Sequence, residues 1–142
     1  MRHSGETRLK FSVFAFDSNA AIDLLRHDRP TPPPFAETDS LVMPLFVLAE
    51  LRFGFSRATR ASQLEELTNA CRILTPDAGT IPRYVKVREE LLRNRSLPQS
   101  PERREGLHHD IWIAALCLQH ALPLLSNDRD LDGVQGLHLI HW

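Results

Sequence analysis

Four acidic residues lie beside apolar stretches of the sequence, where a carboxylate is unusual. They are Asp17, Glu50, Asp110 and Asp128. If the fold brings them together, a hard divalent cation is the simplest way to relieve their mutual repulsion, because such ions prefer oxygen ligands. A bound dication polarises a phosphoryl oxygen and lowers the pKa of a bound water. The chemistry to expect from these residues is therefore metal-assisted hydrolysis of a phosphodiester.

Glu50 has the most apolar surroundings of the four. On a helix, its neighbours at a spacing of three and four residues are Phe46, Val47, Phe53 and Gly54. A carboxylate in such a stripe is expected to face the core, where without a partner it costs free energy or takes up a proton. We therefore expect Glu50 to be buried and to have a partner.

Each acid also has an ordinary structural explanation when it is considered alone. Asp17 could cap a helix, Asp128 could stabilise a turn, and Asp110 could favour the first turn of a helix. Glu50 could form a buried pair with an Arg. Only the convergence of all four would distinguish a metal site from these local roles.

The elements that must position these acids alternate along the chain. Strands are predicted for residues 11–16, 41–43, 72–75, 122–126 and 137–141, and helices for residues 20–26, 45–55, 64–71, 81–95 and 111–120. This alternation predicts an α/β fold, a three-layer α/β/α sandwich with a mainly parallel central sheet. Asp17 and Asp128 follow predicted strands, and ligands of such folds gather at the carboxyl ends of the strands.

The chain is expected to form one domain, over residues 11–142. Its 142 residues are 42% hydrophobic and 25% charged, which is ordinary globular chemistry. Residues 1–10 are predicted to be a polar, disordered leader. Residues 96–106 contain Pro98, Pro101 and a run of charges, so a mobile loop is predicted there. Ser18 or Asn19 is expected to cap the first helix.

The charge of the chain bears on its possible partners, and its cysteine content bears on the compartment in which it works. Seventeen basic residues nearly balance eighteen acidic ones, so no overall positive field would hold nucleic acid, and any such contact must be local. Cys71 and Cys117 have no metal-ligand spacing and are expected to be reduced, which fits a cytoplasmic protein. The early apolar run at residues 11–16 is too short to span a bilayer, so no membrane partner is expected.

Four segments, in order, resemble the signature segments of the PIN-domain ribonucleases of the VapC toxin type, which belong to type II toxin–antitoxin systems. The segments are FDSNAAIDLL at residues 16–25, VLAELRFG at 47–54, HDIWIAA at 109–115 and LSNDRD at 125–130. The resemblance extends over nearly the whole chain, from residue 14 to residue 142. A single segment would be weak, but four in order with an acid at each expected place are specific.

The resemblance implies the roles of the site residues. Asp17, Glu50, Asp110 and Asp128 would form the catalytic and metal-binding cluster, with Asp17 and Asp110 the most direct ligands of Mg²⁺ or, as the alternative, Mn²⁺. The groups that support the acids or orient substrate would be Asn19, Ser126, His109 and the more peripheral Asp130.

The resemblance also implies an activity and partners. The chain would be a Mg²⁺-dependent endoribonuclease toxin that cleaves RNA, such as tRNA or rRNA, with metal-activated water. It would form a homodimer and be neutralised by a small VapB-like antitoxin. The main alternative is a catalytically silent PIN-like subunit that only binds partners in a regulatory complex, although retaining all four acids would then carry an electrostatic cost.

Several residues leave narrower questions open. His109 stands where the family usually has Asn, so it would either cap the helix or touch substrate. The run His108-His109-Asp110 also permits a transition-metal site, although no second His or Cys group accompanies it. Trp112 and Trp142 are expected to anchor the core, and nothing in the sequence requires them to stack on bases.

Overall fold

The computed structural model describes residues 11–26, 32–55, 61–94 and 101–142. The predicted leader and the first half of the predicted loop, residues 96–100, lie outside these ranges. Within them, no helix combines the length and the apolar character that crossing a membrane requires.

Five strands form the central sheet, in the order β3-β2-β1-β4-β5. In chain order they are β1 (Val13–Phe16), β2 (Ser40–Pro44), β3 (Cys71–Leu74), β4 (Leu124–Leu125) and β5 (Leu139–Ile140). Every neighbouring pair is parallel, so all five carboxyl ends meet at one edge of the sheet. The central strand β1 is apolar and almost wholly buried, as expected for a strand covered on both faces.

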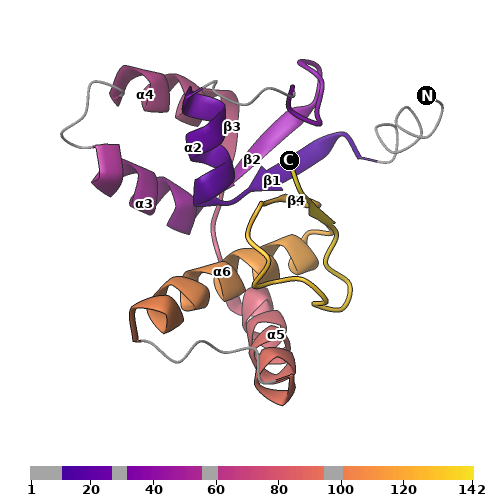
Figure 1. Cartoon of the computed structure of the whole chain (residues 1–142). Coiled ribbons are helices and arrows are strands. Elements are labelled where there is room, and N and C mark those ends of the chain that lie inside the picture. Colours follow the sequence, from indigo (N-terminus) through magenta and orange to yellow (C-terminus); the bar gives the residue numbers. More distant parts are fainter. Residues whose placement is uncertain (1–10, 27–31, 56–60, 95–100) are drawn as a thin grey trace.

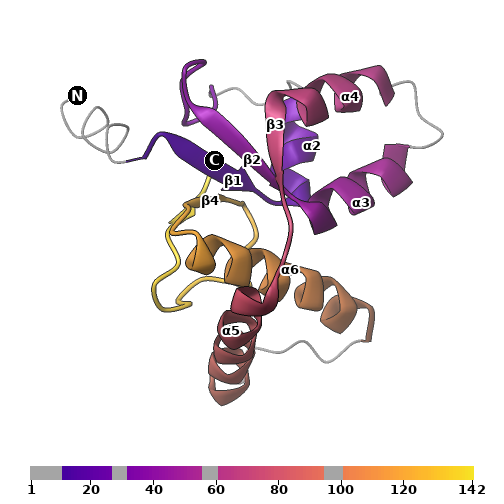
Figure 2. The same cartoon turned by 180° about the vertical axis from the view of Figure 1, so that it is seen from behind.

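The helices form two groups on opposite sides of the sheet, which Figures 1 and 2 show from the two sides. One group consists of α2 (Ser18–Arg26), α3 (Leu45–Phe55) and α4 (Ala61–Ala70). The other consists of α5 (Ile81–Arg93), preceded by the short 3₁₀ helix η1 (Ala78–Thr80), and α6 (Pro101–Gln119). The predicted three-layer α/β/α sandwich is therefore confirmed.

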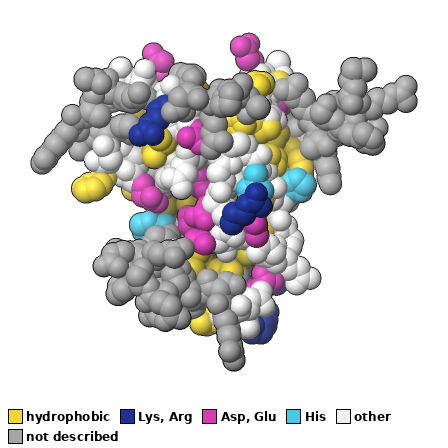
Figure 3. All heavy atoms as spheres, viewed as in Figure 1, with side chains coloured by type: hydrophobic (Ala, Val, Ile, Leu, Met, Phe, Trp, Pro, Cys, Tyr) yellow, Lys and Arg dark blue, Asp and Glu magenta, His cyan; other side chains and the backbone are white. Residues whose placement is uncertain are grey.

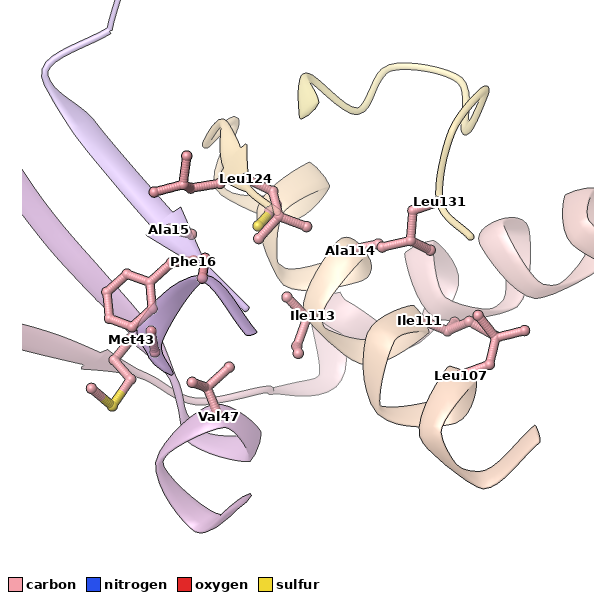
Figure 4. Packing of buried hydrophobic residues seen from close by; sticks show 14 of the residues in the cluster. Ala15, Phe16, Met43, Val47, Leu107, Ile111, Ile113, Ala114, Leu124 and Leu131 are labelled. Atoms are coloured by element: carbon pink, nitrogen blue, oxygen red, sulfur yellow. The ribbon is translucent and has the colours of Figure 1, made fainter. Parts of the chain in front are cut away.

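The middle section of helix α6 is buried in the core. From Ile111 to Cys117 its side chains are buried, except that of Trp112, which is only half-buried. Figure 4 shows residues of β1, β2, β4 and α3 alongside those of α6. This segment is therefore buried nearly all round, but the expectation that Trp112 anchors the core is not confirmed.

The start of α6 was predicted wrongly. The helix begins at Pro101, within the segment for which a loop was predicted, and not at Ile111. Proline is tolerated in the first turn of a helix, and Glu and Arg are good helix formers, so proline and charge content were misleading signals here. His109 and Asp110 consequently lie well inside α6, and His109 does not cap it.

A hydrogen-bonded network joins the start of α5 to the end of α6. The side chain of Asp77 caps η1 by accepting from the Gly79 amide, and Thr80 completes a capping box with Asp77. Gln119 Nε2 donates to Asp77 Oδ1 over 2.7 Å, and Gln119 Oε1 accepts from the hydroxyl of Thr80. This network ties the start of α5 to the end of α6.

Candidate metal centre

Asp17 lies at the carboxyl end of the central strand and has two structural contacts. Its Oδ1 accepts from the Ala20 amide over 2.9 Å, so Asp17 caps α2 and the predicted caps Ser18 and Asn19 do not. Its Oδ2 accepts from the hydroxyl of Ser126, the residue that directly follows β4. Because β1 and β4 are neighbours with parallel register, their next residues meet at the same edge.

The loop after β4 is folded by its own polar side chains. The amide of Asp128 donates to Ser126 Oγ over 3.1 Å, and the amide of Asp130 donates to Asp128 Oδ1 over 2.9 Å. Such local bonds between side chain and backbone are typical of Ser and Asp in turns. They hold Asp128 and Asp130 on the same side of the loop.

Asp110 of α6 meets this loop. One carboxylate oxygen from each of Asp110, Asp128 and Asp130 lies within 4.8 Å of the other two. Two ligands on opposite sides of one Mg²⁺ ion are about 4.2 Å apart, since each bond is about 2.1 Å long. Three oxygens that lie within 4.8 Å of one another are therefore compatible with ligands of one such ion.

The acidic side chains gather in the middle of the molecular face between the α2–α3 pair and α6, as Figure 3 shows. Glu50 of α3 lies at the rim of this cluster, with 41% of its side chain exposed and Oε1 3.3 Å from Nδ1 of His109. The expectation that Glu50 is buried is wrong. Phe53, three residues further along α3, is 85% exposed, so this apolar stripe does not face the core along its whole length.

The acidic side chains of the cluster are close enough to change one another's electrostatic environment. Burial, followed by repulsion from Asp128, Asp17, Glu50 and Asp130, raises the pKa of Asp110 to about 8. The pKa of Asp17 is also raised, mainly by burial, although its bonds with Ser126 and Ala20 oppose the shift. The three other predicted acids and Asp130 therefore all act on Asp110.

The chemistry of this donor set fits a hard dication. Burial and the repulsion of four neighbouring carboxylates raise the pKa of Asp110, and a bound dication would offset that repulsion. Carboxylate oxygens without sulfur or imidazole ligands suit Mg²⁺ or Mn²⁺. The group of potential ligands found in the described residues contains only Asp, which gives the transition-metal alternative no support.

Among the described residues, neither histidine beside Asp110 belongs to the group of potential metal ligands. His108 Nδ1 lies 3.1 Å from the hydroxyl of Tyr84 on α5, and His109 lies against Glu50. His109 is thus at the rim of the cluster, with 45% of its side chain exposed. That position leaves it available to a substrate.

The supporting residues differ in their placement. Ser126 is buried and contacts two of the acids, whereas Asn19 is exposed on α2. Sequence reasoning did not identify Asn127, whose Oδ1 accepts from the Trp142 amide over 2.6 Å and whose Nδ2 donates to Asp23 over 3.4 Å. Its only sequence signal is its position inside the fourth motif. Asn127 anchors the loop that carries Asp128.

Comparisons with known proteins agree with this architecture. The profile of the PIN-domain family matches residues 14–137. No curated protein matches the chain. Solved structures with a similar fold include VapBC2 from Rickettsia felis bound to a DNA fragment from its promoter, with a TM-score of 0.71 and 18% identity over 92% of this chain and 98% of that chain.

Two further structures have similar TM-scores, sequence identities and coverage. VapBC-1 from nontypeable Haemophilus influenzae has a TM-score of 0.68 and 20% identity over 92% of this chain and 98% of that chain. VapBC-5 from Mycobacterium tuberculosis, a member of the VapBC family of toxin–antitoxin systems, has a TM-score of 0.66 and 23% identity, covering 92% of this chain and 99% of that chain. At these identities the likeness concerns the fold alone.

Proposed function

The chain belongs to the PIN-domain family, and from that premise we propose that it is a Mg²⁺-dependent endoribonuclease toxin of a toxin–antitoxin pair. PIN domains are generally nucleases. The observation that carries the proposal is that carboxylate oxygens of Asp110, Asp128 and Asp130 lie within 4.8 Å of one another, with Asp17 and Glu50 adding to the repulsion on Asp110. A dication would relieve this repulsion.

In this proposal, Asp110 and Asp128 hold the metal together with Asp17 and Glu50, and Asp130 adds a fifth acid. Bound Mg²⁺, or Mn²⁺, would supply a polarised phosphoryl oxygen and a water of lowered pKa. Ser126 keeps the Asp17 carboxylate in place through its hydroxyl. Glu50 is the acid at the solvent rim, where its carboxylate also contacts His109.

The proposed substrate and partners are those that the resemblance implies. We propose RNA, such as tRNA or rRNA, as the substrate, with His109 touching it at the rim and Asn19 orienting it from α2. The similar structures are VapBC complexes, which supports a small VapB-like antitoxin as the partner of this chain. A homodimer in the cytoplasm completes the proposal.

The test is cleavage of total RNA by the purified protein. Wild type with Mg²⁺ is expected to cleave, whereas wild type with EDTA and the Asp17→Asn variant are not, because each lacks part of the metal centre. Glu65→Gln serves as the matched control, since it removes one negative charge from the exposed surface of α4. It should cleave like wild type.

Equal cleavage in all four samples would refute the proposed metal centre. No cleavage by any sample, with circular dichroism spectra showing folded protein, would favour the alternative of a silent PIN-like binding subunit.

A further inference from the structure

The hydrogen-bond ladder between β4 and β5 stops at Ser126, where the loop that carries Asp128 begins. The Ser126 amide still donates to the Ile140 carbonyl over 3.0 Å, as in a regular ladder. In a parallel pair, the next bond would run from the Trp142 amide to the Ser126 carbonyl. The structure replaces this one bond by two bonds that involve side chains.

His141 and Asn127 provide these two bonds. Nδ1 of His141 donates to the Ser126 carbonyl over 2.7 Å, since a carbonyl oxygen can only accept. The Trp142 amide donates to Asn127 Oδ1 over 2.6 Å. The loop after β4 and the segment after β5, both yellow in Figure 1, thus stay joined although the chain no longer forms strands there.

The contact with His141 completes the hydrogen bonding of Ser126. This residue is buried, its amide is bonded to Ile140, and its carbonyl is bonded to His141. Its hydroxyl donates to Asp17 and accepts from the Asp128 amide. Ser126 therefore connects His141 to two acids of the candidate metal centre, and a rotation of Ser126 would displace the hydroxyl that both acids contact.

The second ring nitrogen of His141 reaches a later part of the loop. Nε2 lies 3.1 Å from Oδ1 of Asp132, whose Oδ2 lies 3.4 Å from Nη1 of Arg129. The side chains of His141 and Asp132 are 31% and 40% exposed, so solvent weakens their contact. The bond to the buried Ser126 is better shielded, and we expect it to be the more important of the two.

We propose that His141 is a positioning residue of the metal centre, which holds the loop at Ser126 so that Asp128 and Asp130 lie beside Asp110. This inference rests on the proposed metal centre, and it adds a residue that contacts neither metal nor substrate. Groups that orient metal ligands typically contribute about 10- to 100-fold in metal affinity. Because His141 acts through Ser126, we expect a contribution at the lower end, about 10-fold.

The test compares the affinity of the full chain and its variants for Mn²⁺, measured by loss of the electron paramagnetic resonance signal of the free ion. His141→Asn keeps a donor at the place of Nδ1, whereas His141→Gln keeps one only near the place of Nε2. His141→Ala keeps neither. His141→Asn should bind Mn²⁺ almost as tightly as wild type, and the other two variants should bind it about 10-fold more weakly.

Two control variants separate this role from a general loss of stability. His138→Ala removes an exposed histidine of the same segment, whose ring packs on Phe11 at a centroid distance of 4.7 Å. Gln119→Ala removes two hydrogen bonds between α6 and the start of α5, away from the loop. Both variants should bind Mn²⁺ like wild type.

Two results would overturn the inference alone. One is equal Mn²⁺ affinity of wild type and His141→Ala, and the other is a loss of affinity in His141→Asn as large as that in His141→Ala. Cleavage of total RNA by wild type would in either case leave the proposed function standing.

Two other results concern the proposed function as well. Mn²⁺ affinity that depends on His141 as expected, without cleavage of RNA by wild type, would support the inference and count against the enzyme. Failure of folded wild type to bind Mn²⁺ would refute the metal centre and this inference with it.

Discussion

Replacing Asp110 by Asn is expected to stabilise the metal-free protein at neutral pH. Burial and four neighbouring carboxylates raise the pKa of Asp110 from 3.8 to about 8 in the folded state. The folded state therefore binds this proton more tightly than the unfolded state does. The resulting stabilisation is complete below about pH 4 and is lost as the pH rises through about 8. Asn keeps the shape of the side chain and carries no charge.

The magnitude follows from the size of the shift. At about 1.4 kcal/mol for each pKa unit, the whole shift would correspond to about 6 kcal/mol. Asp110 is only half-buried, and solvent screening reduces this to about 2–3 kcal/mol at pH 8. For a domain of this size, each kcal/mol changes the melting temperature by about 2–4 °C. We expect the variant to melt about 5–10 °C above wild type in EDTA.

The assay is thermal unfolding followed by circular dichroism, in EDTA, at several pH values between about 5 and about 8. The difference between the variant and wild type should be small at the acidic end and largest at the alkaline end. Adding Mg²⁺ should raise the melting temperature of wild type but not that of the variant, because only wild type retains the full ligand set. Glu65→Gln should follow wild type throughout. Equal melting of wild type and Asp110→Asn in EDTA across the pH range would refute the reasoning.

Three further predictions concern single contacts. Ser126→Ala removes both the donor to Asp17 and the acceptor of the Asp128 amide. The initial rate of RNA cleavage should therefore fall about 10- to 100-fold, while the circular dichroism spectrum is unchanged. An unchanged rate would contradict the role of this hydroxyl. Ile113→Ala empties a fully buried position of α6 and should lower the free energy of unfolding in urea by about 3–4 kcal/mol, whereas a loss below about 1 kcal/mol would mean that the site is not packed as described. Gln119→Ala removes both of its bonds at the start of α5 and should cost about 1–2 kcal/mol in the same measurement, with no change expected in the affinity for Mg²⁺.

Apolar runs were the most informative signal in the sequence. The runs before Asp17 and Asp128 indicated buried parallel strands, and the structure has a strand shortly before each of them. Parallel topology then placed both residues at one edge of the sheet without any knowledge of tertiary contacts. The order of four motifs added the remaining acids.

Burial and precise spacing could not be predicted from local patterns. The neighbours of Glu50 suggested a core position, but whether a helical stripe faces the core depends on how far the helix extends beyond the sheet. Asp130 was expected to be peripheral, yet it lies with Asp110 and Asp128 because backbone amides bond to side chains within the loop. Ring contacts of Trp112 with Phe46 and Tyr84 join three helices, and no pattern within one segment reveals such contacts.

Asp17 supports the architecture and the reactive centre with the same carboxylate. One of its oxygens completes the first turn of α2, and the other receives the hydroxyl of Ser126. The Asp17→Asn substitution would preserve the first bond, whereas Asp17→Ala would abolish both, so comparing the two variants separates damage to the scaffold from damage to the chemistry. A loss of cleavage activity that is equal in the two variants results from the lost charge of Asp17. Any additional loss in the Asp17→Ala variant results from the missing cap of α2.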